Sequence, residues 1–232
     1  MIFLLMFTLS RLTHSELFTS SLKLCHLLNM ELEKLNSLED LTHEANLNDK
    51  FSSMIQKIRQ ELPKYYFNQP SYPIDDCLDE DSRISRFVTN PVNAYMLIYR
   101  FNSVWPELQS VAQAHGNPEI ANYSEFLALS PNELKGARDA FYRLQVFYML
   151  EPVHLSDGTL SPEWKSISKS WTIIPKGLTP TDMYEIGRIA FGYKDNESSK
   201  AWMLTALKHI QKHDIKNDEL VFDILDHLSW SE

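Results

Sequence analysis

The chain has 232 residues, of which 44% are hydrophobic and 23% charged, and its formal net charge is -9 at pH 7. This composition is that of a folded protein with one or two domains rather than of a disordered chain. The negative charge and the lack of a lysine or arginine cluster argue against nucleic acid as a partner, because neutralising phosphates requires a basic surface. An acidic surface favours neutral or basic partners.

The first residues predict a secretory signal. Met1 to Ser10 is an apolar run that is too short to span a bilayer but long enough for the core of a signal peptide. Small residues near Ser15 suit a cleavage site, so residues 1–15 are expected to be a signal peptide, and no membrane span is expected. The alternative is the start of a buried helix, which the capping-box spacing of Thr13 and Glu16 favours.

Two further features are compatible with the secretory pathway. Asn122 and Asn196 each begin an Asn-X-Ser triplet, the acceptor sequence for N-linked glycosylation. Cys25 and Cys77 are the only cysteines, and two cysteines cannot form a zinc site of four thiolates. In an oxidising compartment they could form one disulfide, and the sequence alone leaves open whether they pair or stay free.

The hydrophobic pattern predicts an all-α protein, because apolar residues recur every three or four positions and prolines stand mostly at helix starts or in loops. The first helix is expected from Glu16 to about His43. Its apolar seam is coiled-coil-like but lacks a sustained heptad, so pairing with a second copy competes with packing against the next helix. Further helices are expected at 48–62, from Asn90 onward with a kink or new start at Pro106, and from Ser130 to about Phe147, whereas 63–83 and 151–177 are expected to be loops.

The stretch from Leu178 to Ile210 predicts two short amphipathic helices packed as a hairpin. Thr179 and Asp182 have the spacing of a capping box at the start of the first helix. Gly187 and Ala190 are small residues that let a second helix approach closely. Hairpins of this kind stack in tetratricopeptide-type proteins, whose concave surface is lined by the other face of each first helix.

That other face, together with a third helix from Asn217 to Trp230, is predicted to form a peptide-binding groove. On the third helix two carboxylates and an aromatic residue lie at positions i, i+3 and i+7 and therefore share a face. The alternative is that the aromatic residues belong to the core or are scattered over the surface. The expected binding residues are Tyr184, Arg188, Phe191, Asp223, Asp226 and Trp230.

No catalytic or metal-binding arrangement is predicted. His209 and His213 are four positions apart on a helix, as in many metal-binding pairs, but without a third ligand they are expected to be surface residues. Neither a nucleophile with its base in a known context nor a phosphate-binding glycine loop occurs. We therefore expect this chain to bind no metal and no cofactor.

Three blocks of the sequence resemble the amino-terminal half of the α subunit of collagen prolyl 4-hydroxylase. The resemblance implies a helical, coiled-coil dimerisation domain at 16–150, followed by a linker at 151–177. It implies an incomplete tetratricopeptide-like domain at 178–232 that binds proline-rich peptide. The blocks occur in the family's order and are Glu16 to Ser20, Asn90 to Tyr95 with Trp105 after it, and Gly136 to Gln145 with Leu178 to Leu207.

The same resemblance implies a location in the lumen of the endoplasmic reticulum. It implies as partners a proline-rich peptide, a second copy or a full-length α subunit, and protein disulfide isomerase. The family uses Fe(II), 2-oxoglutarate and ascorbate through a catalytic domain that is not expected in this chain. Where the family has tyrosines, this chain has Asn196 and Glu197 after the first groove helix, and His227 and Trp230 in the third.

Three functions are compatible with these features of the sequence. The first is peptide recognition combined with self-association, without catalysis. The second is participation in an assembled procollagen-proline dioxygenase whose iron site another chain supplies. The third is a generic helical adaptor that binds no proline-rich peptide.

Overall fold

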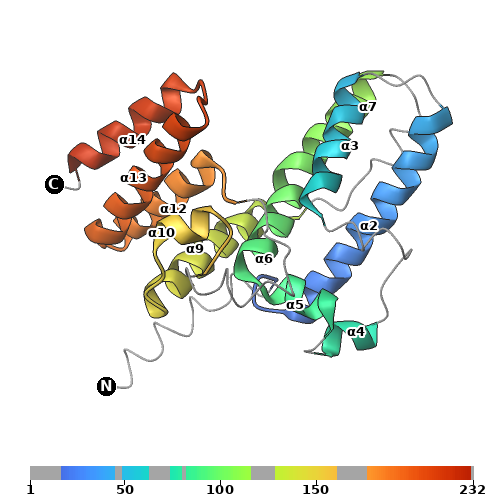
Figure 1. Cartoon of the computed structure of the whole chain (residues 1–232), viewed down its shortest axis with the longest axis horizontal. Helices are drawn as coiled ribbons and strands as arrows, with labels where there is room; N and C mark the ends of the chain where they lie inside the picture. The colour runs from blue at the N-terminus through green and yellow to red at the C-terminus, as the bar shows by residue number, and fades with distance from the viewer. Residues whose placement is uncertain are drawn as a thin grey trace. The chain divides into compact units, whose positions relative to one another are not determined.

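The computed structural model describes residues 17–44, 49–62, 74–79, 82–115, 129–160 and 177–230. Every regular element in these ranges is a helix, as the hydrophobic pattern predicted, so the protein is all-α (Figure 1). The chain forms two compact units, Met1–Gly136 and Ala137–Glu232. The signal peptide expected at 1–15 and the glycosylation site expected at Asn122 lie outside the described residues.

The first unit is built around the long helix α2 (Ser21–Glu44). Four other helices pack against it: α3 (Asp49–Glu61), α4 (Ile74–Leu78), α5 (Arg83–Thr89) and α6 (Pro91–Tyr99). The coiled-coil-like seam of α2 therefore packs against helices of the same chain. This is one of the two alternatives that the sequence left open. The seam residues that are buried are Cys25, Leu28, Leu32, Leu35 and Leu38, together with Phe18 before the helix, whereas Leu22, also expected in the seam, is 44% exposed.

A π-helical segment, η3 (Arg100–Val104), joins α6 to α7 (Trp105–His115). The backbone N–H of Trp105 donates to the carbonyl of Arg100, five residues earlier, which is the hydrogen bond of a π-helix. Pro106 follows directly and has no N–H, so it could not continue an α-helical ladder. The break expected at Pro106 is thus a widened turn within a continuous helical segment.

This widened turn brings two side chains to the same buried carboxylate. Arg100 donates to both oxygens of Glu31 through Nε and Nη2, at 2.7 and 2.6 Å. Trp105 donates from Nε1 to Glu31 Oε1 at 3.0 Å. In an α-helix, residues five positions apart would point about 140° apart. The π-helical turn therefore lets Arg100 and Trp105 meet at one point of α2.

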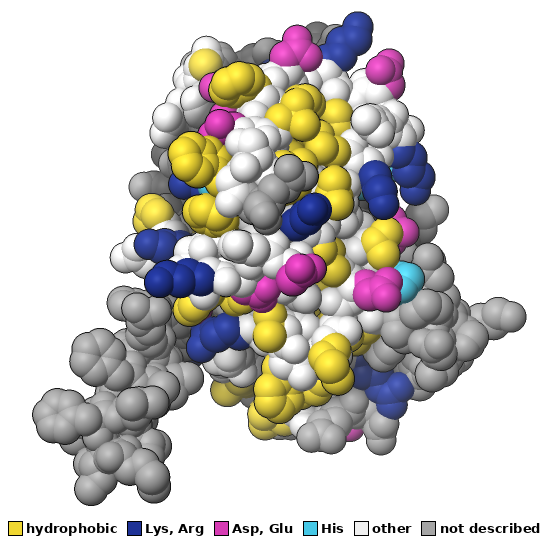
Figure 2. Space-filling model, turned by 90° about the vertical axis from the view of Figure 1, so that its left-hand side faces the viewer, with side chains coloured by type: hydrophobic (Ala, Val, Ile, Leu, Met, Phe, Trp, Pro, Cys, Tyr) yellow, Lys and Arg dark blue, Asp and Glu magenta, His cyan; other side chains and the backbone are white. Residues whose placement is uncertain are grey.

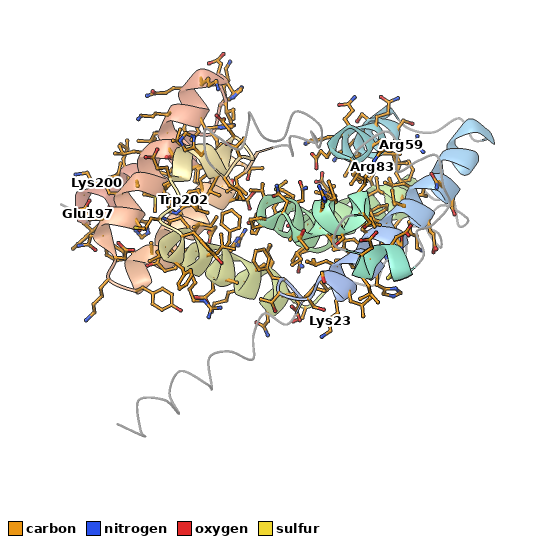
Figure 3. All side chains as sticks on the ribbon, turned by 60° about the horizontal axis from the view of Figure 1, so that its bottom comes forward. Lys23, Arg59, Arg83, Glu197, Lys200 and Trp202 are labelled. Atoms are coloured by element: carbon orange, nitrogen blue, oxygen red, sulfur yellow. A yellow bond between two sulfur atoms is a disulfide. The ribbon has the colours of Figure 1, made fainter. Side chains whose placement is uncertain are left out.

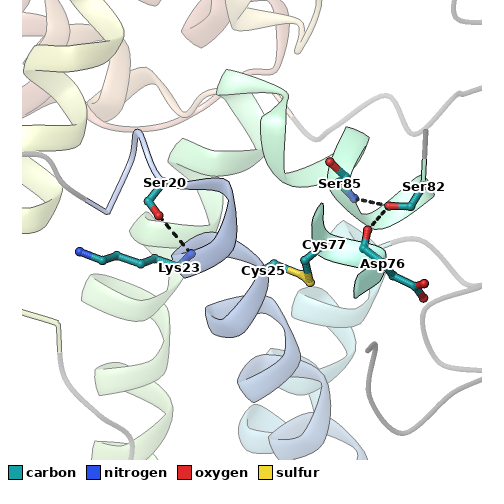
Figure 4. The surroundings of a disulfide bond; sticks show 7 residues. All are labelled: Ser20, Lys23, Cys25, Asp76, Cys77, Ser82 and Ser85. Carbon is teal, nitrogen blue, oxygen red and sulfur yellow. Dashed lines mark hydrogen bonds between the residues drawn. A yellow bond between two sulfur atoms is a disulfide. The ribbon is translucent and has the colours of Figure 1, made fainter. Parts of the chain in front are cut away.

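A disulfide joins Cys25 in α2 to Cys77 in α4 (Figure 4). The two Cα atoms are 6.0 Å apart, and the cysteines are separated by 52 positions in the sequence. Ser82 then links α4 to α5, because its hydroxyl donates to the carbonyl of Asp76 and accepts from the N–H of Ser85 (Figure 4). The short helices α4 and α5 are in this way held against α2.

Three short helices lie where no helix was expected. α4 interrupts the loop expected at 63–83, α5 follows it, and α10 (Pro152–Ser156) lies within the linker expected at 151–177. Helices of five to seven residues are too short to establish a hydrophobic period, which is why the pattern missed them. Residues 161–176 lie outside the described part of the chain, and the division into domains at 151–177 stays a prediction.

The second unit contains the predicted hairpin, formed by α12 (Pro180–Gly192) and α13 (Asn196–Lys212), with α14 (Asp218–Trp230) packed against it. The predicted capping box is present: Thr179 accepts from the N–H of Asp182, and the Asp182 side chain accepts from the N–H of Thr179. A Cβ atom at Gly187 would lie 3.2 Å from the Cβ of Trp202. The predicted close approach of the two helices is therefore what the structure shows.

Helix α9 (Pro131–Phe147) supports this hairpin through its part that lies in the second unit. Trp202 of α13 is fully buried, and its Nε1 donates to Gln145 of α9 at 3.4 Å. Figure 3 shows Trp202 on the inner side of α13, whereas Glu197 and Lys200 of the same helix point outward. The hairpin therefore presents its apolar side to α9, and α14 packs against both α12 and α13.

Candidate functional site

The candidate site is the surface where α12 meets α14, and we call it the α12–α14 face. Both helices belong to the second unit, and they contact each other directly. Six of its residues are those that the sequence predicted, and His227 is added by the structure. The face consists of Tyr184, Arg188 and Phe191 on α12 and of Asp223, Asp226, His227 and Trp230 on α14.

Three rings form the centre of this face. Tyr184 and Phe191 are two helical turns apart on α12, and the imidazole of His227 lies edge-on to both. The ring centroids are 5.6 Å apart for Tyr184 and His227 and 5.5 Å apart for Phe191 and His227, with interplanar angles of 73° and 82°. Edge-to-face contacts of this kind are favoured by the charge distribution of aromatic rings. These contacts stabilise the packing of α14 against α12.

His227 was identified in the sequence only as a departure from the family pattern and not as a site residue. Its position, four residues after Asp223 and three before Trp230, already places it on the same face of α14. That spacing was the signal that could have found it. Tyr184 was expected to line the groove, but it is only 9% exposed and lies at the base of the face rather than on its surface.

Charged groups surround Tyr184. The guanidinium carbon of Arg188 lies 5.7 Å from the centre of the Tyr184 ring, and Arg188 Nη1 is 3.3 Å from Glu185 Oε1. Burial raises the pKa of the Tyr184 phenol, and the negative charge of Asp223 raises it further, with a smaller contribution from Asp226. Tyr184 therefore remains a neutral phenol, and both aspartates lie close enough for their charge to be felt at its ring.

Trp230 is the exposed aromatic residue of the face, with 72% of its surface open to solvent. It is the last residue of α14 and follows Asp226 by about one helical turn. Figure 2 shows the side of the molecule on which α13 and α14 lie; hydrophobic side chains gather in its upper part and again at its lower end, and both carboxylates and basic side chains lie between the two groups. The residues named above make the α12–α14 face both aromatic and acidic.

The turn between α12 and α13 is held by a group of hydrogen bonds that the sequence did not predict. Tyr142 of α9 donates from its hydroxyl to Asp195 Oδ2 at 2.9 Å, and Tyr193 donates to Asp139 Oδ1 at 2.7 Å. The rings of Tyr142 and Tyr193 are stacked with centroids 5.4 Å apart. Asp195 also accepts from the N–H of Ser198 and so caps α13. These contacts position the hairpin that carries one side of the face.

The remaining predicted residues lie elsewhere. Asn196 is exposed and is the first residue of α13, so its predicted glycosylation stays a prediction. His209 lies in the last turn of α13 and His213 is the C-cap residue of this helix; their ring centroids are 4.4 Å apart. Partial burial, followed by the charge of His213, lowers the pKa of His209.

The fold and this face define a class of protein before any comparison: an all-α chain in which a helical hairpin and a third helix present aromatic and acidic side chains on one surface. Comparison with known families makes the assignment particular. The family described as "Prolyl 4-Hydroxylase alpha-subunit, N-terminal region" matches residues 20–162. The chain belongs to this family, as the three sequence blocks indicated.

Individual relatives extend the similarity over nearly the whole chain. Prolyl 4-hydroxylase subunit alpha-2 of Caenorhabditis elegans is 28% identical over 235 residues, which cover 98% of this chain and 39% of the relative. Prolyl 4-hydroxylase subunit alpha-1 of Gallus gallus is 30% identical over 224 residues, 94% of this chain and 38% of the relative. The Homo sapiens subunit alpha-1 is 29% identical over 223 residues, which cover 95% of this chain and 37% of the relative. The chain thus spans between 37% and 39% of the length of these relatives.

The described residues contain neither a cluster of metal ligands nor a membrane-spanning helix. Across the described residues, no group of three or more His, Cys, Asp or Glu side chains is arranged to hold a metal ion. These residues therefore do not fit the iron centre that the family resemblance implies, and no reaction step is assigned to them. In the same part of the chain, no helix is both long and apolar enough to cross a membrane.

Proposed function

We propose that this chain is a peptide-recognition module of the prolyl 4-hydroxylase alpha-subunit family and binds a proline-rich, collagen-like peptide on the α12–α14 face. The observation that carries the proposal is the aromatic surface of this face, with Trp230 72% exposed beside the ring cluster of Tyr184, Phe191 and His227. A proline-rich strand adopts the polyproline II conformation before it binds, so it loses little conformational entropy on an aromatic surface.

The geometry suits an extended ligand. Along α14, the seven steps from Asp223 to Trp230 rise by about 10 Å. One turn of a polyproline II strand contains three residues and rises by about 9 Å. A peptide with a three-residue repeat lying along α14 would therefore present equivalent positions to Asp223 and to Trp230.

The setting of the module is part of the same proposal. A disulfide between buried cysteines is compatible with folding in an oxidising compartment, and the lumen of the endoplasmic reticulum is the compartment that the family resemblance implies. The relatives are named as subunits, so we propose that the chain works in an assembly. A second copy, a full-length alpha subunit and protein disulfide isomerase are the proposed partners, and 4-hydroxylation would be performed by the iron site of another chain.

The proposal is tested by calorimetric titration of the chain with a (Pro-Pro-Gly)5 peptide. Saturable binding is expected, and Trp230→Ala should weaken it by about tenfold or more, since exposed aromatic anchors carry much of the energy of such interfaces. The matched control is Leu225→Ala. Leu225 is 52% exposed on the same helix but lies about 100° or more around the helix from each of the four face residues on α14, so its removal should leave the affinity unchanged.

Two results would contradict the proposal. One is the absence of binding by a chain whose circular dichroism shows that it is folded. That result would favour the generic helical adaptor that binds no proline-rich peptide. The other is an equal loss of affinity in Trp230→Ala and Leu225→Ala, which would mean that the peptide does not recognise the α12–α14 face.

A further inference from the structure

Helix α14 has an unusual distribution of charge. Its sequence, DELVFDILDHLSW, contains four carboxylates and no lysine or arginine. Asp218 and Glu219 lie in the first turn, where the positive end of the helix dipole stabilises negative charge. Asp223 and Asp226 lie further along the helix, where the dipole gives no such help. They are also three positions apart, a spacing at which like charges repel each other.

The rest of the described chain does not neutralise these two carboxylates. No ion pair joins Asp223 or Asp226 to a lysine or arginine among the described residues. Ser229 donates to the backbone carbonyl of Asp226 and not to its carboxylate. Arg188 is the basic residue of the α12–α14 face, but its guanidinium is paired with Glu185 and lies against the Tyr184 ring. Among the described residues, the carboxylates of Asp223 and Asp226 are therefore without an ion-pair partner on the face.

The surroundings of these charges point to the kind of group that would neutralise them. The charges of Asp223 and Asp226 both act on the Tyr184 phenol, and the exposed ring of Trp230 follows Asp226 by about one turn. Aromatic ring faces attract alkylammonium and guanidinium groups, and carboxylates form charge-assisted hydrogen bonds with them. A metal ion is a poorer fit, because no third ligand joins the two carboxylates within the described residues.

We propose that the α12–α14 face selects a proline-rich peptide that carries a basic residue, lysine or arginine, and binds the basic side chain between Asp223, Asp226 and Trp230. This inference rests on the proposed function and specifies its ligand class. The prolines contact the aromatic side chains, and the cationic group supplies the charge that α14 lacks. A formal net charge of -9 on the chain adds long-range attraction for such a ligand.

The test compares three peptides of equal length that differ at one position: (Pro-Pro-Gly)2-Pro-X-Gly-(Pro-Pro-Gly)2 with X as arginine, citrulline or glutamate. Citrulline has nearly the shape of arginine without its charge. At low ionic strength the arginine peptide is expected to bind about tenfold more tightly than the citrulline peptide. The glutamate peptide is expected to bind more weakly than both.

Two double variants separate a local effect from the overall charge. Asp223→Asn with Asp226→Asn should bring the affinity ratio of the arginine and citrulline peptides close to one. Asp214→Asn with Asp218→Asn removes the same net charge outside the face, from the exposed turn before α14 and from the first residue of this helix, and it should leave the ratio as in the unmodified chain.

Equal affinity of the unmodified chain for arginine and citrulline peptides would overturn the inference, and so would an equal fall of the ratio in both double variants. Binding of (Pro-Pro-Gly)5 without a gain from arginine would overturn the selectivity for a basic residue and leave the proposed function standing. A folded chain that binds none of these peptides would contradict both.

Discussion

At the scale of single residues, the first unit depends on a charge that it buries completely. Glu31 and Arg100 are 0% and 2% exposed, and a second carboxylate, Glu61, lies 3.8 Å from Arg100 Nη1. Burial by itself lowers the pKa of Arg100, but the charge and hydrogen bonds of Glu31, with help from Glu61, raise it above its usual value. The guanidinium therefore stays charged in the interior, and its stability there depends on Glu31.

Replacing Glu31 by glutamine should accordingly be severe. Glu31→Gln leaves the buried guanidinium without its main partner, and the free energy of unfolding should fall by about 3–5 kcal/mol. Urea unfolding followed by circular dichroism measures the change. The control is Glu107→Gln, which breaks an ion pair with Lys50 in which both side chains are 59% exposed and should cost about 1 kcal/mol or less. Equal effects of the two variants would contradict this account of the core.

Asp195 gives a prediction for the dependence of stability on pH. Burial alone would raise the pKa of this carboxyl, but hydrogen bonds from Ser198 and from the Tyr142 hydroxyl lower it below its usual value. A carboxyl with a lowered pKa in the folded state adds stability above its unfolded pKa of about 3.9, and that stability is lost as the pH falls through the folded pKa.

We therefore expect Asp195→Asn to be less stable than the unmodified chain at pH 7 and to approach it as the pH falls below about 4. Tyr142→Phe removes one of the hydrogen bonds and should reduce the same acid-dependent difference without abolishing it. Urea unfolding at a series of pH values measures both. A difference between Asp195→Asn and the unmodified chain that stays constant from pH 7 to pH 3 would contradict the role assigned to Asp195.

At the scale of elements, three glycines of the second unit differ in what surrounds them. A Cβ atom at Gly177 would lie 1.8 Å from the carbonyl oxygen of Ser156, whereas one at Gly192 would have nothing within 4 Å. At Gly187 it would lie 2.9 Å from the mobile end of Met203 and 3.2 Å from the Trp202 Cβ. The backbone around Gly177 cannot give way as a methionine side chain does.

The loss of stability caused by an alanine substitution should be largest where the space around the glycine is smallest. Gly177→Ala is expected to lower the free energy of unfolding by about 2 kcal/mol or more, as an overpacked site does. Gly187→Ala should cost less, because the strain against α13 is offset by a gain in helix propensity of about 1 kcal/mol. Gly192→Ala serves as the control and should be neutral or stabilising. Thermal unfolding of the three variants tests the order, which would be refuted if Gly192→Ala destabilised as strongly as Gly177→Ala.

The disulfide is the other contact between elements whose value can be measured. A cross-link between residues 52 positions apart stabilises a folded chain by about 4 kcal/mol in the loop-entropy model. Replacing both Cys25 and Cys77 by alanine should lower the free energy of unfolding by about this amount. A reductant should destabilise the unmodified chain and leave the double variant unchanged. If the reductant had no effect on the unmodified chain, the disulfide would have no part in its stability.

At the scale of the whole molecule, the long amphipathic segments were predictable and the contacts between distant segments were not. The capping box at Thr179 and the small residue Gly187 are local signals, and they predicted the start and the close packing of the hairpin correctly. The pairing of Glu31 with Arg100 joins residues 69 positions apart, and nothing in the local pattern marks Glu31 as buried. The same holds for the hydrogen bond between Tyr142 and Asp195.

The candidate site was predictable to the same extent. Helical spacing grouped Asp223, Asp226 and Trp230 on one face of α14 and Tyr184 with Phe191 on α12. It could not show that His227 would lie between the rings of Tyr184 and Phe191, because that contact depends on how α14 crosses α12. It also could not show that Tyr184 would be almost buried.

The most direct test of peptide recognition on the α12–α14 face is nuclear magnetic resonance of the indole N–H groups during titration with (Pro-Pro-Gly)5. The chain has five tryptophans, and single Trp→Phe variants assign their signals. We expect the Trp230 signal to shift saturably with peptide, while the signals of the fully buried Trp105 and Trp202 stay in place. Saturable binding with an unchanged Trp230 signal, or no binding by the folded chain, would contradict it.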